Sequence, residues 1–171
     1  ITPFMADEWE GLSLAKEEKM MEAVETKVSE NDLSEVAKTI TTLPTGKKFL
    51  RKIEKLISDR KRMFFESDAM DWAMGELLAY GTLLKEGYDV RISGQDVERG
   101  TFSHRHALLK AEESEEEVVL LNSINPENQG NFSIYNSLLS EYAVLGFDYG
   151  YAMASPNALT IWEAQFGDFS N

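Results

Sequence analysis

The chain has 171 residues, 43% hydrophobic and 11% aromatic, which suffices for the core of one domain with or without an appendage. Its net charge of −13 argues against a nucleic-acid binder and against adhesion to anionic lipid, because both partners are recognised through Lys and Arg. The absence of cysteine excludes disulfides and thiolate metal sites.

The first residues and the hydropathy pattern carry no sign of export or membrane insertion. No apolar run approaches the ~20 residues of a membrane helix. Residues 1–5 lack the basic segment and apolar core of a secretory signal. We therefore expect an intracellular protein with no membrane partner and no visible targeting segment. Because the chain begins without Met, we expect it to be a piece of a longer protein.

Residues 1–67 are highly charged and predict a helical linker or extension. A break at residues 42–46 separates a short helix near 31–37 from a strongly helical stretch at 47–62. That stretch has apolar residues at the spacing of one helix face: Phe49, Ile53, Leu56 and Ile57.

The same stretch, residues 47–62, concentrates positive charge. It holds eight basic residues, namely Lys47, Lys48, Arg51, Lys52, Lys55, Arg60, Lys61 and Arg62. One interpretation is a docking surface for an acidic partner. The other, which the composition favours, is a solvated face that balances an acidic body.

Residues 68–171 have the pattern of an α/β domain. A long helix is predicted from about residue 67 to residue 85 or 86, with Trp72 on its apolar side and Gly87 as its terminator. Residues 88–93 alternate as a strand does. Residues 112–117 predict a solvated acidic turn, and residues 158–163 predict another short strand.

The loop at residues 94–106 is dense in polar and ionisable groups, and loops that follow strands carry function out of proportion to their length. It contains the only two histidines, His104 and His106. In a strand this pair would share a face suited to a metal ion, but no third ligand is visible. The pattern favours hydrogen-bonding groups at a cleft or subunit contact.

Residues 132–138 predict an imperfect strand that runs straight into a helix. Ser140 stands at the expected N-cap, which places Glu141 in the first helical turn at the carboxyl end of a strand. Ligands of open α/β sheets bind at such edges. Glu141 is therefore either an acid that complements the helix dipole or a carboxylate directed into a ligand crevice. The helix itself is expected to bury an apolar face made by Val144, Leu145, Phe147, Tyr151 and Ala152.

Four stretches resemble the thiamine-diphosphate-dependent first component of the 2-oxoglutarate dehydrogenase complex. They are residues 71–73 (DWA), 91–106 (RISGQDVERGTFSHRH), 135–147 (YNSLLSEYAVLGF) and 162–169 (WEAQFGDF). The resemblance implies that residues 68–171 are most of an aminopyrimidine-binding α/β domain, a parallel sheet flanked by helices, truncated at its C-terminus. The Gly-Asp-Gly motif for diphosphate and Mg²⁺ does not occur here, so both groups are expected on the other half of the enzyme.

The resemblance also implies roles for individual residues. Glu141 would hydrogen-bond the pyrimidine ring nitrogen of thiamine diphosphate and exchange a proton with it, a relay that Gln could not perform. Leu139 would be the apolar prop under the cofactor. Phe166 would stack on the aminopyrimidine, with Phe169 the less favoured choice.

The remaining candidates follow from the loop at residues 94–106. Gln95, at the end of its strand, would face the reaction centre. His104 and His106 match positions of the family's motif, where they would support the loop, the active site or a subunit interface. A homodimer is expected to cover apolar surface around Trp72, Phe147 and Phe166.

The implied activity is decarboxylation of 2-oxoglutarate and transfer of the succinyl group to a lipoyl group of dihydrolipoyl succinyltransferase, in the citric acid cycle. This chain alone is expected to be inactive. Three alternatives remain open: the same chemistry on another 2-oxo acid such as 2-oxoadipate, an inactive domain acting only in subunit assembly, and an acidic interaction protein without cofactor. A bacterial protein would be cytoplasmic, and a eukaryotic one would lie in the mitochondrial matrix.

Overall fold

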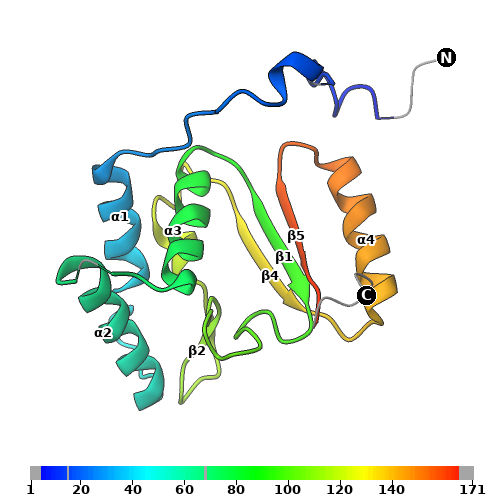
Figure 1. Ribbon diagram of the computed structural model, residues 1–171. Helices are drawn as coiled ribbons and strands as arrows, with labels where there is room; N and C mark the ends of the chain where they lie inside the picture. Colours follow the sequence, from blue (N-terminus) through cyan, green and yellow to red (C-terminus); the bar gives the residue numbers. More distant parts are fainter. Residues whose placement is uncertain (1–4, 15, 68, 166–171) are drawn as a thin grey trace.

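A three-stranded parallel sheet organises the chain. In this computed structural model, which describes residues 5–14, 16–67 and 69–165, the strand order is β4 (Phe132–Asn136), β1 (Val90–Gly94), β5 (Leu159–Glu163). Ile92 of β1 pairs with Ile134 on one side and with Ile161 on the other. The carboxyl ends of all three strands therefore meet at one edge (Figure 1).

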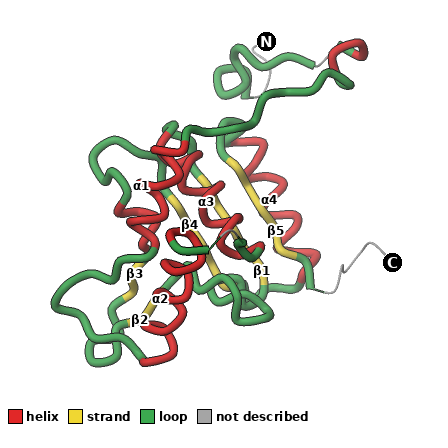
Figure 2. The backbone as a smooth tube through the Cα atoms, turned by 60° about the vertical axis from the view of Figure 1, so that its left-hand side comes forward, coloured by secondary structure: helices red, strands yellow, loops and turns green. Residues whose placement is uncertain are grey.

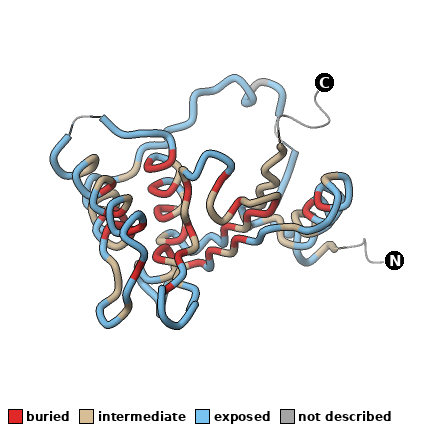
Figure 3. Tube along the Cα trace, turned by 90° about the horizontal axis from the view of Figure 1, so that it is seen from below, coloured by how far each residue is buried: buried red, intermediate tan, exposed pale blue. Residues whose placement is uncertain are grey.

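Helices cover both sides of this sheet (Figures 1 and 3). On one side α3 (Trp72–Lys85) packs against β1, and on the other α4 (Glu141–Ala154) packs against β5 and β1. Outside α3 lies α1 (Glu30–Ile40), which in turn contacts α2 (Arg51–Phe65). The predicted α/β class, with helices preceding a parallel sheet, is confirmed.

The core lies between α3, α1 and the sheet, where Figure 3 shows the buried residues gathering. Its fully buried side chains come from both parts of the chain and include Val36, Met74, Leu84, Val90, Ile92, Val97 and Leu121. Because Val36 of α1 packs with residues of α3 and β1, the helical extension shares the core of the α/β domain.

A second, smaller cluster joins α2 to the hairpin of β2 (Leu109–Lys110) and β3 (Glu117–Val118), which precedes the 3₁₀ helix η2 (Leu120–Ser123) (Figure 2). The helix α2 begins at Arg51, later than predicted, but Phe49 is buried beside it. The acidic turn of the hairpin is exposed, as predicted. Its carboxylates nevertheless pair with lysines that precede α2, Lys47 with Glu116 at 2.6 Å and Lys48 with Glu112 at 3.1 Å.

The helix ends follow local sequence signals. The side chain of Ser140 accepts the backbone N–H of Ala143, as predicted for the N-cap of α4. Asp71 caps α3 in the same way, accepting the N–H of Met74 at 2.8 Å. The helix α3 stops at the predicted Gly87, whose φ of +89° is a conformation that glycine adopts without strain.

The prediction of a mainly helical first third is wrong before residue 30. Between residues 5 and 29 the described helix is limited to the short 3₁₀ helix η1 (Glu17–Lys19), and the chain runs along one edge of the domain (Figures 1 and 2). Leu14 and Met21 of this segment are almost fully exposed. A short helix that buries no apolar face is marginal in water, so charge and propensity alone do not hold one here. The segment is attached by the indole N–H of Trp9, which donates to the carbonyl of Met153 at 2.8 Å.

Among the described residues, no helix is both long enough and apolar enough to cross a membrane.

The position of α3 against the sheet predicts contrasting effects for two of its residues. Met74 is fully buried, so Met74→Ala should lower the free energy of unfolding by about 2–5 kcal/mol. Trp72 was expected on the apolar side of the helix but is 95% exposed, so Trp72→Ala should change the stability of this chain by less than about 0.5 kcal/mol. Urea denaturation of both variants measures the difference, and similar losses in the two would contradict this packing.

Candidate functional site

Three segments meet at the carboxyl edge of the sheet, because each follows a parallel strand. They are the loop after β1, the turn between β4 and α4, and the residues after β5. Together they carry most of the residues singled out from the sequence, including Gln95, Leu139 and Glu141.

Glu141 lies at the start of α4 with its carboxyl group turned toward β5. Its Oε2 accepts a hydrogen bond from the indole Nε1 of Trp162 at 2.8 Å. Its Oε1 is buried and has no hydrogen-bond partner among the residues that the structure describes. A buried oxygen without a donor is costly, so Oε1 marks a position where a ligand's N–H or O–H would be stabilised.

The surroundings of Glu141 are apolar and open. Leu139 is 57% exposed, and its neighbours Leu138 and Tyr142 are also exposed. The backbone N–H of Leu139 donates to the hydroxyl of Ser137 at 3.1 Å, which shapes the turn before α4. The structure thus brings Leu139 next to Glu141 in an uncovered apolar rim. The two aromatic candidates, Phe166 and Phe169, lie outside the described residues.

The loop after β1 is compact and conformationally strained. Positive φ angles occur at Gly94, Asp96, Gly100, Ser103 and His106. The loop is closed by two backbone hydrogen bonds. The N–H groups of Arg105 and His106 both donate to the backbone carbonyl of Arg99. Gly100 must lack a side chain, because a Cβ there would overlap the ring of His104. Such strain persists only where surrounding contacts hold it. Gln95 lies at the start of this loop and is partly exposed.

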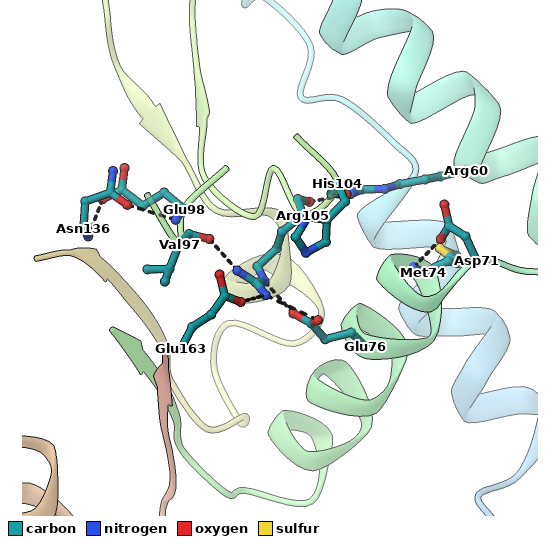
Figure 4. Close-up of polar contacts among 10 residues, drawn as sticks. All are labelled: Arg60, Asp71, Met74, Glu76, Val97, Glu98, His104, Arg105, Asn136 and Glu163. Carbon is teal, nitrogen blue, oxygen red and sulfur yellow. Dashed lines mark hydrogen bonds and ion pairs between the residues drawn. The ribbon is translucent and has the colours of Figure 1, made fainter. Parts of the chain in front are cut away.

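The contact that holds this loop is made by Arg105 (Figure 4). Its guanidinium is buried, pairs with Glu76 of α3 and Glu163 of β5, and donates to the carbonyl of Val97 at 2.8 Å. One cation therefore ties the loop to a helix and to a strand. This role could not be predicted from hydropathy, which treats an arginine as exposed.

A second buried arginine corrects an expectation about α2. Arg60 was counted with the solvated basic face but is only 3% exposed. Its Nη2 donates to the carbonyl of His104 at 2.9 Å and also to that of Arg105 (Figure 4). Burial is the main reason that its pKa is lowered to about 10. Arg60 thus fixes the backbone of the histidine pair from the side opposite the sheet.

The two histidines do not lie on a strand, so the shared face that a metal site would need does not form. The Nδ1 of His104 is buried without a described partner, beside a pocket of about 360 Å³ that Glu76, Arg105 and Glu163 also line. Across residues 5–14, 16–67 and 69–165, no group of three or more His, Asp or Glu side chains is arranged to hold a metal ion.

A buried ion pair, which sequence reasoning missed, fixes α4 to the sheet. Asp148 is 4% exposed and accepts hydrogen bonds from the guanidinium of Arg91 and the hydroxyl of Ser93, both on β1. The guanidinium also lies about 5 Å from the ring centroids of Phe147 and Tyr151.

The inner face of α4 is therefore partly polar, which corrects the predicted apolar face. Val144 is buried as expected, but Phe147 is 57% exposed. The signal available in the sequence was Asp148, an acid placed four residues after the buried Val144 and hence on the same side of the helix.

Comparison with known proteins places these features in a family. The profile of the transketolase pyrimidine-binding domain matches residues 68–171. The chain is 45% identical over 170 residues to the mitochondrial 2-oxoglutarate dehydrogenase of Schizosaccharomyces pombe, covering 98% of this chain and 17% of that protein.

Two further relatives carry similar names. The mitochondrial 2-oxoglutarate dehydrogenase of Saccharomyces cerevisiae is 44% identical over 165 residues, 95% of this chain and 16% of that protein. The 2-oxoglutarate dehydrogenase E1 component of Cupriavidus necator is 48% identical over 157 residues, 90% of this chain and 16% of that protein. The chain thus spans about a sixth of the length of these relatives.

The Arg91–Asp148 pair predicts a large loss of stability when one partner is neutralised. Asp148→Asn should lower the free energy of unfolding by about 3–5 kcal/mol, because it leaves the largely buried guanidinium of Arg91, 12% exposed, without a counter-charge. Asp59→Asn, which removes an exposed pair with Arg62 in α2, should cost less than about 1 kcal/mol. Equal midpoints for both variants in urea denaturation would show that the buried pair does not hold α4.

The environment of His106 predicts a pH-dependent stability. Burial, together with the nearby charges of Arg60 and Lys52, lowers the pKa of His106 below its ordinary value of 6.5. The unfolded chain therefore binds this proton more readily, so stability should fall as the pH drops from 6.5 through the lower pKa of the folded state. The variant His106→Gln should lose less stability over that range, and identical pH profiles in denaturation experiments would contradict the assignment.

Proposed function

This chain belongs to the transketolase pyrimidine-binding domain family, and we propose that it forms the aminopyrimidine half of the cofactor pocket in a 2-oxoglutarate dehydrogenase. The observation that carries the proposal is the buried Oε1 of Glu141, which lacks a described partner at the carboxyl edge of the sheet. The names of the similar proteins supply the substrate, 2-oxoglutarate.

The residues present fit the pyrimidine end of thiamine diphosphate. The indole of Trp162 occupies one oxygen of Glu141 and fixes the plane of the carboxyl group, which leaves Oε1 for a ring nitrogen. Leu139 offers an apolar surface beside it, and Phe166 is proposed to stack on the ring, with Phe169 as the alternative. When bound, the cofactor supplies the electron sink for decarboxylation of a 2-oxo acid.

Glu141 would hold and transfer a proton at Oε1. The hydrogen bond from Trp162 occupies Oε2 and so keeps the other oxygen, Oε1, directed at the ligand. Gln95, at the end of β1, is proposed to face the reacting atoms. His104 and His106 are proposed to act at the active site or at the subunit contact, on a loop held by Arg105.

The diphosphate and Mg²⁺ are proposed to bind to the other half of the enzyme. A second subunit would supply that half, since α4 and the start of α3 expose apolar side chains of the kind that an interface covers: Trp72, Tyr142, Phe147 and Tyr149. We therefore propose a homodimer, which passes the succinyl group to the lipoyl group of dihydrolipoyl succinyltransferase in the citric acid cycle.

Residues 1–67 are proposed to be an N-terminal extension, with its α-helices from residue 30 onward, and residues 68–171 the aminopyrimidine-binding domain. The enzyme would work in the mitochondrial matrix of a eukaryote or in the cytoplasm of a bacterium.

Replacement of Glu141 tests the proposal in the full-length enzyme. Glu141→Gln should lower kcat by about 10²–10⁴-fold, because Gln can hydrogen-bond the ring nitrogen but cannot transfer a proton. Cofactor affinity, measured by tryptophan fluorescence, should change much less. Glu66→Gln, an exposed carboxylate at the end of α2, serves as the matched control. Normal turnover by Glu141→Gln with the fold intact would refute the role.

A further inference from the structure

A second polar pocket lies where the start of α2 meets the loop after β1. It encloses about 200 Å³ over a partly apolar floor. Its polar lining comes from four elements of the fold and comprises Lys52, Glu98, Arg99, His106, Lys110 and Asn136. The pocket includes His106 but none of Glu141, Trp162 and Leu139, so it does not coincide with the proposed cofactor site.

The charge of this pocket is opposite to that of the chain. The protein carries a net charge of −13, whereas three cations and a histidine line this pocket beside a single carboxylate, that of Glu98. The carboxylate of Glu98 already accepts the backbone N–H of Asn136 at 3.2 Å, and the backbone N–H of Glu98 donates back to the side chain of Asn136 (Figure 4). It therefore braces the end of β4 and is not ion-paired with the cations of the pocket.

The cations differ in how far they are neutralised. Arg99 pairs with Asp96 in its own loop, and Lys110 pairs with Glu117 across the hairpin at 3.2 Å. The side chain of Lys52, which is exposed, makes neither an ion pair nor a hydrogen bond within the described part of the chain. One ammonium group is therefore available to a ligand without breaking an existing contact.

His106 reports the excess of positive charge. It is partly buried in the pocket wall. Burial is the main cause of its lowered pKa, followed by the charges of Arg60, Lys52, Arg99 and His104. An anion among these groups would oppose that effect and would accept N–H donors from several directions. Hydrogen bonds from charged donors to an oxyanion are among the strongest that proteins form.

We infer that this pocket binds a small oxyanion of the phosphate class, either free inorganic phosphate or the end of a phosphomonoester. Its volume is below the range of about 300–1,000 Å³ that drug-sized ligands occupy, which suits an anion of a few atoms. The inference also gives a role to one of the basic residues in the stretch 47–62. Lys47 and Lys48 pair with the acidic turn, Arg60 is buried, and Lys52 is left for the ligand.

Calorimetric titration tests the site in the full-length protein. Inorganic phosphate is added at constant ionic strength, after saturation with thiamine diphosphate and Mg²⁺ so that any diphosphate site is filled. Saturable binding is expected, and Lys52→Gln should weaken it by about tenfold or more, the effect of one charge-assisted hydrogen bond. Lys110→Gln, on the opposite wall, should weaken it as well.

The matched control is Lys55→Gln, which removes the same charge from the same helix but at a position that does not line the pocket. Unchanged binding in this variant supports a discrete site. If Lys52→Gln and Lys55→Gln weaken phosphate binding equally, the overall positive charge of α2 explains the binding and the inference is wrong. The absence of saturable phosphate binding would also overturn it. A competition titration with glycerol phosphate distinguishes the two candidate ligands. If glycerol phosphate competes with inorganic phosphate, the pocket accepts a phosphomonoester. If it does not compete, the pocket is a site for free phosphate.

Discussion

The buried contact of Asp148 with Arg91 and Ser93 determines how the helix that carries Glu141 lies on the sheet. Glu141 and Asp148 are seven residues apart, about two helical turns, so they face the same side of α4. Any rotation or sliding of α4 would leave the charge of Asp148 or of Arg91 buried and unpaired, which is a larger penalty than the pair's own net gain. The contact therefore acts mainly by excluding other positions, and it directs Glu141 toward Trp162 on β5.

Arg105 applies the same principle to the loop after β1. Its guanidinium joins Glu76 on α3, Glu163 on β5 and the carbonyl of Val97 within the loop. The strained backbone of this loop is stabilised by these contacts, because moving Arg105 away would leave its guanidinium and the carboxylates of Glu76 and Glu163 without their partners. The charge pairs of Arg91 and Arg105, and not the apolar core alone, thus shape the carboxyl edge of the sheet where the proposed cofactor site lies.

The distribution of charge and apolar surface separates the molecule into regions with different partners. The outer face of α4 and the beginning of α3 are apolar and exposed, which fits the proposed contact with a second subunit. Away from that face, the start of α2 forms a locally basic pocket on a strongly acidic chain. The net charge averages over both regions, so it argues against a nucleic-acid partner but does not reveal the local pocket that we propose for a small anion.

Local sequence determined the ends of the helices and the position of Glu141, since caps such as Ser140 and a terminating Gly87 act on their own backbone neighbours. The strand pattern placed Glu141 at the carboxyl edge, and the family resemblance proposed its role together with those of Leu139, Gln95 and the histidines. Only the tertiary structure decided that Trp162 holds Glu141, that Asp148, Arg60 and Arg105 are buried, and that Trp72 is exposed. These facts depend on which distant segments meet, and a charged side chain has the same local pattern whether it faces water or a buried partner.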